Sequence, residues 1–166
     1  MLRELFEETL ERLLAAVRTT YGADLVSLVI FGSVARGTPS HESDVDLLVV
    51  AKNLPSGRIT RVDRFEQVEH MLAPWLADLR DRGVNTFLSP VFKTPEEVQI
   101  GSLLFLDLVT DARFLYDEDG FFETYLAKLR NRLKELGARR IQRGSSWHWV
   151  LKPDLRPGEV FDLWKM

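Results

Sequence analysis

The stretch FGSVARGTPSHESDVDLLVV, residues 31–50, predicts the centre of the fold, because it joins two apolar segments through a polar connection. The segment DLVSLVIFG, residues 24–32, is short and rich in branched side chains, which is typical of a buried strand. The segment DVDLLVVA, residues 44–51, has the same character. Residues 33–43 between them hold the glycine, proline and serines of a turn. We therefore expect two buried strands joined by a polar loop.

Gly32 and Ser33 stand where the first of these strands ends. Glycine lets a ligand approach the backbone closely, and N–H groups at a helix start bind anions, with the serine hydroxyl as a further donor. A Gly-Ser pair after a strand is nevertheless most often only a turn. On its own, the pair indicates either an ordinary turn or an anion site.

Asp44 and Asp46 are two residues apart in the second strand, so both carboxylates are expected on one face of the sheet. Their Cα atoms would lie about 6.5–7 Å apart, close enough for both carboxylates to bind divalent cations. Asp44 also fits a solvated turn residue at the strand entry. Asp46 lies in an apolar run, where an unpaired carboxylate is costly. It is therefore either a structural aspartate with partners or a metal ligand.

Helices and further strands are predicted outside this stretch. Apolar residues recur at helical spacing over residues 2–21, 59–82 and 121–136, and residues 94–109 also look helical. Residues 84–92, VNTFLSPVF, fit a third strand, and Pro90 indicates an edge position or a strand end. Residues 112–117 fit a short strand or an extended connection. Strands that alternate with helices predict an α/β or α+β domain with a small sheet.

Composition excludes several classes of protein. The 166 residues include no cysteine, so disulfides, cysteine-ligated zinc and a thiol nucleophile are excluded. The formal charge of −3, from 22 Lys+Arg and 25 Asp+Glu, argues against nucleic-acid binding over the whole surface. No apolar run is long enough for a membrane span, and the first residues lack the pattern of a secretion signal, so we expect a cytoplasmic protein without a membrane partner.

Together, Phe31-Gly-Ser-Val-Ala-Arg-Gly37 and Ser43-Asp-Val-Asp46-Leu-Leu-Val resemble the signature of the minimal nucleotidyltransferases in the DNA polymerase β-like superfamily. The resemblance covers residues 24 to about 97. It implies a small mixed β-sheet flanked by helices. On this basis we expect a single domain over residues 1–166, with its core at 24–97 and a C-terminal helical extension at 98–166. The implied activity is transfer of a nucleoside monophosphate, most simply AMP from ATP, to a hydroxyl or similar acceptor.

The resemblance also implies roles for individual residues. Gly32 and Ser33 would hold the triphosphate, while Asp44 and Asp46 would bind Mg²⁺ and carry the catalysis. Arg36 belongs to the same loop, where it either contacts the nucleotide or braces the loop. The implied ligands are an NTP and Mg²⁺, and the acceptor could be a protein, an RNA end or a small molecule. Small members of this family often act beside a toxin–antitoxin partner protein, which the resemblance also permits.

One position departs from the family pattern. The family supplies a third carboxylate from a neighbouring strand, but residues 84–92 contain no acid, and Ser89 stands at the expected place. Glu96 and Glu97 follow closely, but a helix cap at Thr94 explains them. The chain is therefore expected to be a magnesium-dependent nucleotidyltransferase with two carboxylates. The alternative is a degenerate module that binds nucleotide or a partner protein without turnover.

The C-terminal third contains a basic run from Lys128 to Arg143, with seven basic residues and one acidic residue. Such a run most often forms a solvated helix face. The alternative is a surface for RNA, an acidic partner or the triphosphate, for which Trp147 and Trp149 would offer stacking area. We expect these two tryptophans to pack on the core instead.

Overall fold

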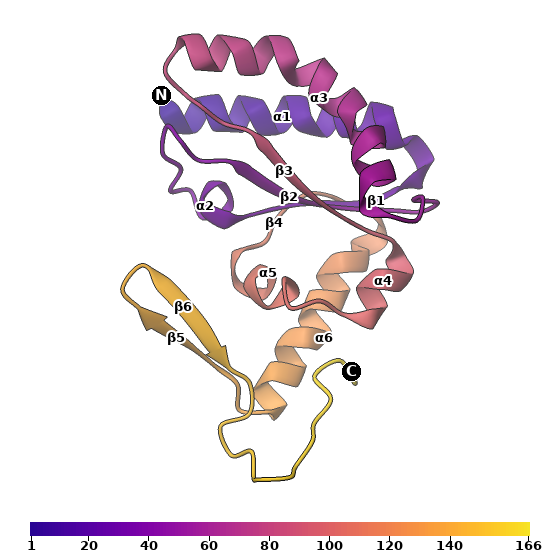
Figure 1. Cartoon of the computed structure of the whole chain (residues 1–166), viewed down its shortest axis with the longest axis vertical. Helices are drawn as coiled ribbons and strands as arrows, with labels where there is room; N and C mark the ends of the chain where they lie inside the picture. Colours follow the sequence, from indigo (N-terminus) through magenta and orange to yellow (C-terminus); the bar gives the residue numbers. More distant parts are fainter.

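The computed structural model describes all residues, 1–166, as six helices, six strands and two short 3-10 turns (Figure 1). The helices are α1 (Leu2–Tyr21), α2 (Gly32–Ala35), α3 (Arg58–Asp81), α4 (Pro95–Ile100), α5 (Phe105–Asp111) and α6 (Phe121–Glu135). The strands are β1 (Leu25–Phe31), β2 (Val45–Ala51), β3 (Leu88–Lys93), β4 (Arg113–Asp117), β5 (Arg139–Arg143) and β6 (Ser146–Val150), and the 3-10 turns are η1 (Gly22–Asp24) and η2 (Glu118–Gly120). None of the helices combines the length and the apolar composition needed to cross a bilayer.

Four strands form the central sheet in the order β3-β2-β1-β4. β2 and β3 run parallel, whereas β1 is antiparallel to both β2 and β4, so the sheet is mixed. β1 and β2 occupy the middle because nearly all of their residues are buried. β3 is an edge strand, as Pro90 predicted. The open choice for residues 112–117 is decided in favour of a strand, β4, which pairs with β1.

Helices cover both faces of this sheet, which confirms the predicted fold class (Figure 1). α1 and α3 lie on one face, and α4, α5 and α6 lie on the other. Successive residues of β2 point to opposite faces, so Leu47 and Val49 pack with α1 and α3, whereas Leu48 and Val50 pack with the other helices. Asp46 is separated from Leu48 and Val50 by even numbers of residues, so it points to the same face of the sheet. Its side chain therefore belongs to the face that α5 and α6 cover.

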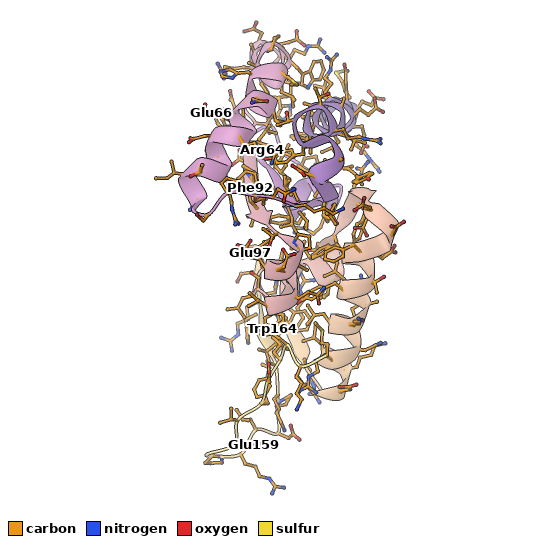
Figure 2. All side chains as sticks on the ribbon, turned by 90° about the vertical axis from the view of Figure 1, so that its right-hand side faces the viewer. Arg64, Glu66, Phe92, Glu97, Glu159 and Trp164 are labelled. Carbon is orange, nitrogen blue, oxygen red and sulfur yellow. The ribbon has the colours of Figure 1, made fainter.

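The single helix expected over residues 94–109 is wrong, because two helices, α4 and α5, occupy this segment. Gly101 interrupts them with a φ of +95°, which residues with a side chain rarely adopt. The ring of Trp164 lies against Gly101, where a Cβ atom would overlap it. Figure 2 shows Trp164 next to α4, with Glu159 near the lower end of the molecule. The final residues of the chain thus return to the junction between α4 and α5.

The basic run from Lys128 to Arg143 does not form one solvated helix face. Gly137, with a φ of +68°, follows the end of α6, and the last part of the run forms β5. β5 and β6 pair in a two-stranded hairpin that stands apart from the central sheet (Figure 1). Within α6, Arg130 and Arg132 donate hydrogen bonds to backbone carbonyls of other segments. Part of the positive charge is therefore used inside the protein.

Candidate functional site

Asp44 and Asp46 lie at the end of β2 that adjoins α2. Asp46 is the second residue of β2 and is partly exposed. Asp44 was expected inside the strand, but it precedes β2 by one residue and is exposed. The Phe87 N–H donates to Asp44 Oδ1 at 3.2 Å, which ties this carboxylate to the segment before β3. The structure therefore brings both predicted carboxylates to the same end of strand β2, next to α2.

Ser89 lies beside Asp46, because the parallel register of β2 and β3 pairs these two residues. This is the strand position at which the family resemblance implies a third carboxylate. No group of three histidine or acidic side chains anywhere in the chain could hold a metal ion. Any ion at this edge would therefore have only Asp44 and Asp46 as acidic ligands.

Glu97 does not replace the missing carboxylate. Its two oxygens accept from the Arg61 guanidinium at 2.8 and 2.9 Å, and Oε2 also accepts from the Thr94 N–H at 2.9 Å. Thr94 Oγ1 in turn accepts from the Glu97 N–H, which completes the capping box of α4. Arg61 lowers the pKa of Glu97. The structural explanation that the sequence suggested for Glu97 is confirmed, and Figure 2 shows this residue on α4.

The charge at Asp46 is only partly balanced. Burial raises the pKa of Asp46 above its ordinary value, and the nearby charge of Asp44 raises it further. The Ser89 hydroxyl and the Arg36 guanidinium act in the opposite direction. A divalent cation would neutralise such a pair of carboxylates and stabilise its charged form.

Gly32 meets Asp46 from the neighbouring strand. Phe31, the last residue of β1, pairs with Asp46, and Gly32 follows with a φ of +72°. A Cβ atom at Gly32 would overlap Oδ2 of Asp46. The positive φ favours glycine at this position, and a Cβ would in addition force the Asp46 carboxylate to shift. The turn after β1 therefore lies directly against the carboxylate of β2.

Ser33 is part of the hydrogen-bond network that closes the loop between β1 and β2. Its hydroxyl donates to Ser43 Oγ at 3.1 Å, and the Ser40 N–H donates to the same oxygen at 2.8 Å. The Thr38 N–H donates to the Ser33 carbonyl at 3.0 Å. These bonds hold the start of α2 against the segment that leads into Asp44.

Arg36 braces the loop from its other end. Its Nη1 atom lies 3.1 Å from Asp111 Oδ2 on α5, and its guanidinium carbon lies 5.2 Å from the ring centroid of Trp147. About a third of the side chain, 34%, remains exposed. Of the two roles left open for Arg36, the bracing contact is present in the structure. Sequence reasoning missed Asp111, because no pattern links it with a loop 75 residues earlier.

Two carboxylates at this edge suit Mg²⁺ that arrives with a nucleotide. Magnesium in proteins often takes only one or two carboxylates and completes its octahedral shell with substrate phosphates and water. Asp44 and Asp46 supply such a pair, and the turn at Gly32 lies next to them. The chemistry of this pair is compatible with the ion, and Asp44 and Asp46 would be its protein ligands.

Comparison of the sequence with known proteins gives two matches. Residues 10–101 match the family described as nucleotidyltransferase domain. Over 149 residues, the chain is 32% identical to "Putative protein adenylyltransferase MJ1305" of Methanocaldococcus jannaschii, which covers 89% of this chain and 93% of that protein.

Solved structures with a similar backbone fold include two from toxin–antitoxin systems. One is a toxin–antitoxin crystal structure with AMP-PNP, with a TM-score of 0.48 and 18% identity over 76% of this chain and 88% of the other. Another is the toxin–antitoxin MntA-HepT, with a TM-score of 0.41 and 16% identity over 80% of this chain and 88% of the other.

Proposed function

The chain belongs to the nucleotidyltransferase domain family, and from this premise we propose that it transfers AMP from ATP to a hydroxyl group of an acceptor protein, with Mg²⁺ as the cofactor. The relative from Methanocaldococcus jannaschii is named as a protein adenylyltransferase, which supports both the nucleotide and the kind of acceptor. We also propose one domain over residues 1–166, because β4 pairs with β1 and α6 covers the same sheet. A cytoplasmic location remains part of the proposal.

The observation that carries this proposal is the contact between Gly32 and Asp46. A nucleotidyltransferase must hold the triphosphate and a divalent cation side by side. In this chain the turn that would take the phosphates lies directly against the carboxylate that would take the ion, so that a Cβ at Gly32 would force the carboxylate to shift.

The proposed reaction follows from the positions of these groups. Gly32 and Ser33 would hold the β- and γ-phosphates, and Asp44 and Asp46 would hold Mg²⁺, which would supply positive charge beside the phosphates. The acceptor oxygen bonds to the α-phosphorus in line with the bond to the β-phosphate oxygen, and that bond breaks to release pyrophosphate. Ser89 is not a base at neutral pH, so the acceptor proton passes to solvent. Positioning and charge neutralisation supply the acceleration.

The direct test measures binding of ATP with and without Mg²⁺, followed by transfer of α-labelled AMP to protein acceptors. We expect magnesium-dependent binding in the wild type and its loss in Asp46→Asn. Glu66→Gln is the matched control, because Glu66 is an exposed acid on α3 outside the site (Figure 2). Binding that does not need the metal, or that survives Asp46→Asn, contradicts the proposed site.

Ser89 keeps a second candidate function open, a module that binds nucleotide or a partner protein without turnover. Its position opposite Asp46 leaves the site with one carboxylate fewer than the family pattern. Each missing ligand removes charge that stabilises the attacking and leaving oxygens. ATP binding without any transfer, together with transfer in Ser89→Asp, would favour this second function.

A further inference from the structure

The hairpin formed by β5 and β6 has two different faces. Paired residues of antiparallel strands point to the same side, so the register divides the side chains into two sets. One set, Arg140, Gln142, Trp147 and Trp149, includes the residues that contact the body of the molecule, although Gln142 itself is exposed. The outer set consists of Arg139, Ile141, Arg143, Ser146, His148 and Val150. Trp149 packs against the core beneath the sheet, as expected, but Trp147 does not.

Trp147 instead lies against two guanidinium groups. The Arg140 guanidinium carbon lies 4.1 Å from its ring centroid, and that of Arg36 lies 5.2 Å away. The indole Nε1–H donates to Asp107 Oδ1 on α5 at 3.0 Å. The ring therefore joins the hairpin to α5 through the hydrogen bond and to the C-cap of α2 through Arg36, whereas Arg140 belongs to the hairpin itself.

Asp111 completes this cluster. Its side chain is only 10% exposed, and Oδ2 lies 3.1 Å from Arg36 and 3.5 Å from Arg140. The Asp111 carboxylate offsets the repulsion between two guanidinium groups that approach the same oxygen. The Trp147 ring gives each of them a cation–π contact, so Arg36 is held by two partners.

Arg36 is directly connected to the candidate site. It is the C-cap of α2, its N–H donates to the Gly32 carbonyl at 3.2 Å, and its charge acts on Asp46. α2 has only four residues, so a movement of Arg36 moves Gly32 as well. Gly32 lies directly against the Asp46 carboxylate. The position of Arg36 therefore sets how the turn meets the carboxylate.

We propose that Trp147 is a positioning residue of the nucleotide site, which fixes Arg36 and thereby the turn that binds the triphosphate. The β5–β6 hairpin is then a functional part of the site, although it lies outside residues 10–101 that match the family. This inference rests on the proposed function for its consequence on ATP binding. Its consequence for the loop does not depend on any ligand.

The first experiment measures hydrogen exchange of the backbone amides in residues 32–43 without nucleotide. We expect Trp147→Ala to accelerate this exchange by about tenfold, because the cation–π and hydrogen-bond contacts that restrain the loop are lost. Trp147→Phe keeps an aromatic face, although a smaller one, and loses the bond to Asp107, so its effect should be intermediate. His148→Ala is the control, because His148 is exposed on the outer face of the hairpin. Unchanged exchange in both Trp147 variants overturns the proposal.

The second experiment measures the dissociation constant for ATP with Mg²⁺ in a double-mutant cycle of Trp147→Ala and Arg36→Ala. We expect each single change to weaken binding by about tenfold and the double change to weaken it no further, because Trp147 acts through Arg36. If the fold-changes in the dissociation constant of the two single variants multiply in the double variant, the proposal is overturned. It is also overturned if binding weakens only in proportion to a lower melting temperature and Trp147→Phe does not restore it. If the wild type binds no ATP, the proposed function fails, while the exchange experiment still decides the role of Trp147.

Discussion

Replacing Ser89 by aspartate places a third carboxylate beside Asp46, because the parallel register brings these residues side by side at the usual strand spacing of about 5 Å. Without a metal ion, this change should destabilise the protein. The added charge faces Asp46, whose pKa is already raised by burial and by Asp44. The change also removes the Ser89 hydroxyl, which acts as a hydrogen-bond donor to Asp46.

The size of the effect follows from the geometry. Two unit charges about 5 Å apart repel by about 3 kcal/mol at an effective dielectric of about 20, and by about 1 kcal/mol in water. Ser89 is exposed, so the repulsion lies between these limits. With about 1 kcal/mol for the lost hydrogen bond, the cost is about 2–4 kcal/mol, or a fall of about 5–15 °C in melting temperature.

The pH dependence has a definite sign. A carboxyl with a raised pKa in the folded protein lowers the free energy of unfolding only at pH values at which the same carboxyl is ionised in the unfolded chain. The cost of Ser89→Asp should therefore be small below about pH 4, the ordinary pKa of aspartate, and grow as the pH rises through the raised pKa of the folded protein. Millimolar Mg²⁺ or Mn²⁺ should recover most of the loss, because the new carboxylate becomes a ligand.

Thermal unfolding at acidic and neutral pH, with and without metal, measures these effects. Ser89→Asn is the matched control, because it has the size of aspartate without the charge. Equal losses in both variants, or a loss in Ser89→Asp that the metal does not reverse, would refute the argument that this position belongs to a metal site.

Three further predictions concern the same region. Gly32→Ala should lower the free energy of unfolding by about 2–3 kcal/mol and abolish ATP binding, because alanine would hold a φ of +72° and overlap Asp46. Urea titration measures the change in stability. Gly37→Ala is the control for backbone strain alone, because Gly37 has a φ of +73° and open space around it. Asp46→Asn should keep or raise the melting temperature while it removes metal-dependent binding, since burial disfavours the charge; a large loss of stability would identify a structural aspartate instead. Glu97→Gln should lower the free energy of unfolding by about 1 kcal/mol at neutral pH, after allowance for the partial solvent exposure of the pair with Arg61. Because Arg61 lowers the pKa of Glu97, this difference should vanish as acid titration passes through the lowered pKa, and a difference that is constant with pH contradicts the pairing.

The central part of the site could be predicted because it is encoded locally. Gly32, Asp44 and Asp46 belong to one strand–loop–strand unit, so spacing and strand alternation alone place them at one edge. The position of Ser89 follows from one further strand, and the observed register with Asp46 agrees with it. The one local error, the start of β2 after Asp44, is a shift of a single residue at a strand end.

The surroundings of the site could not be predicted because they depend on contacts between distant segments. The break between α4 and α5 needs Gly101 to meet Trp164 near the end of the chain, and helical periodicity does not reveal such a contact. The position of α5 then decides where Asp111 lies, and hence which partner Arg36 finds. Trp147 and Trp149 point to the same face of the hairpin, yet only Trp149 packs on the core.

The edge position of β3 has a consequence for association with other chains. An open strand edge normally presents a row of backbone donors and acceptors on which another strand can add, and here that edge adjoins the carboxylates. Pro90 lacks an N–H, so the row of donors along β3 is interrupted in its middle. A second β-strand therefore cannot pair along the whole edge, which protects the protein from aggregation at this point. Under the proposed function, an acceptor that reaches the site past β3 cannot add as a strand along the whole edge, so side chains have to take part in its recognition.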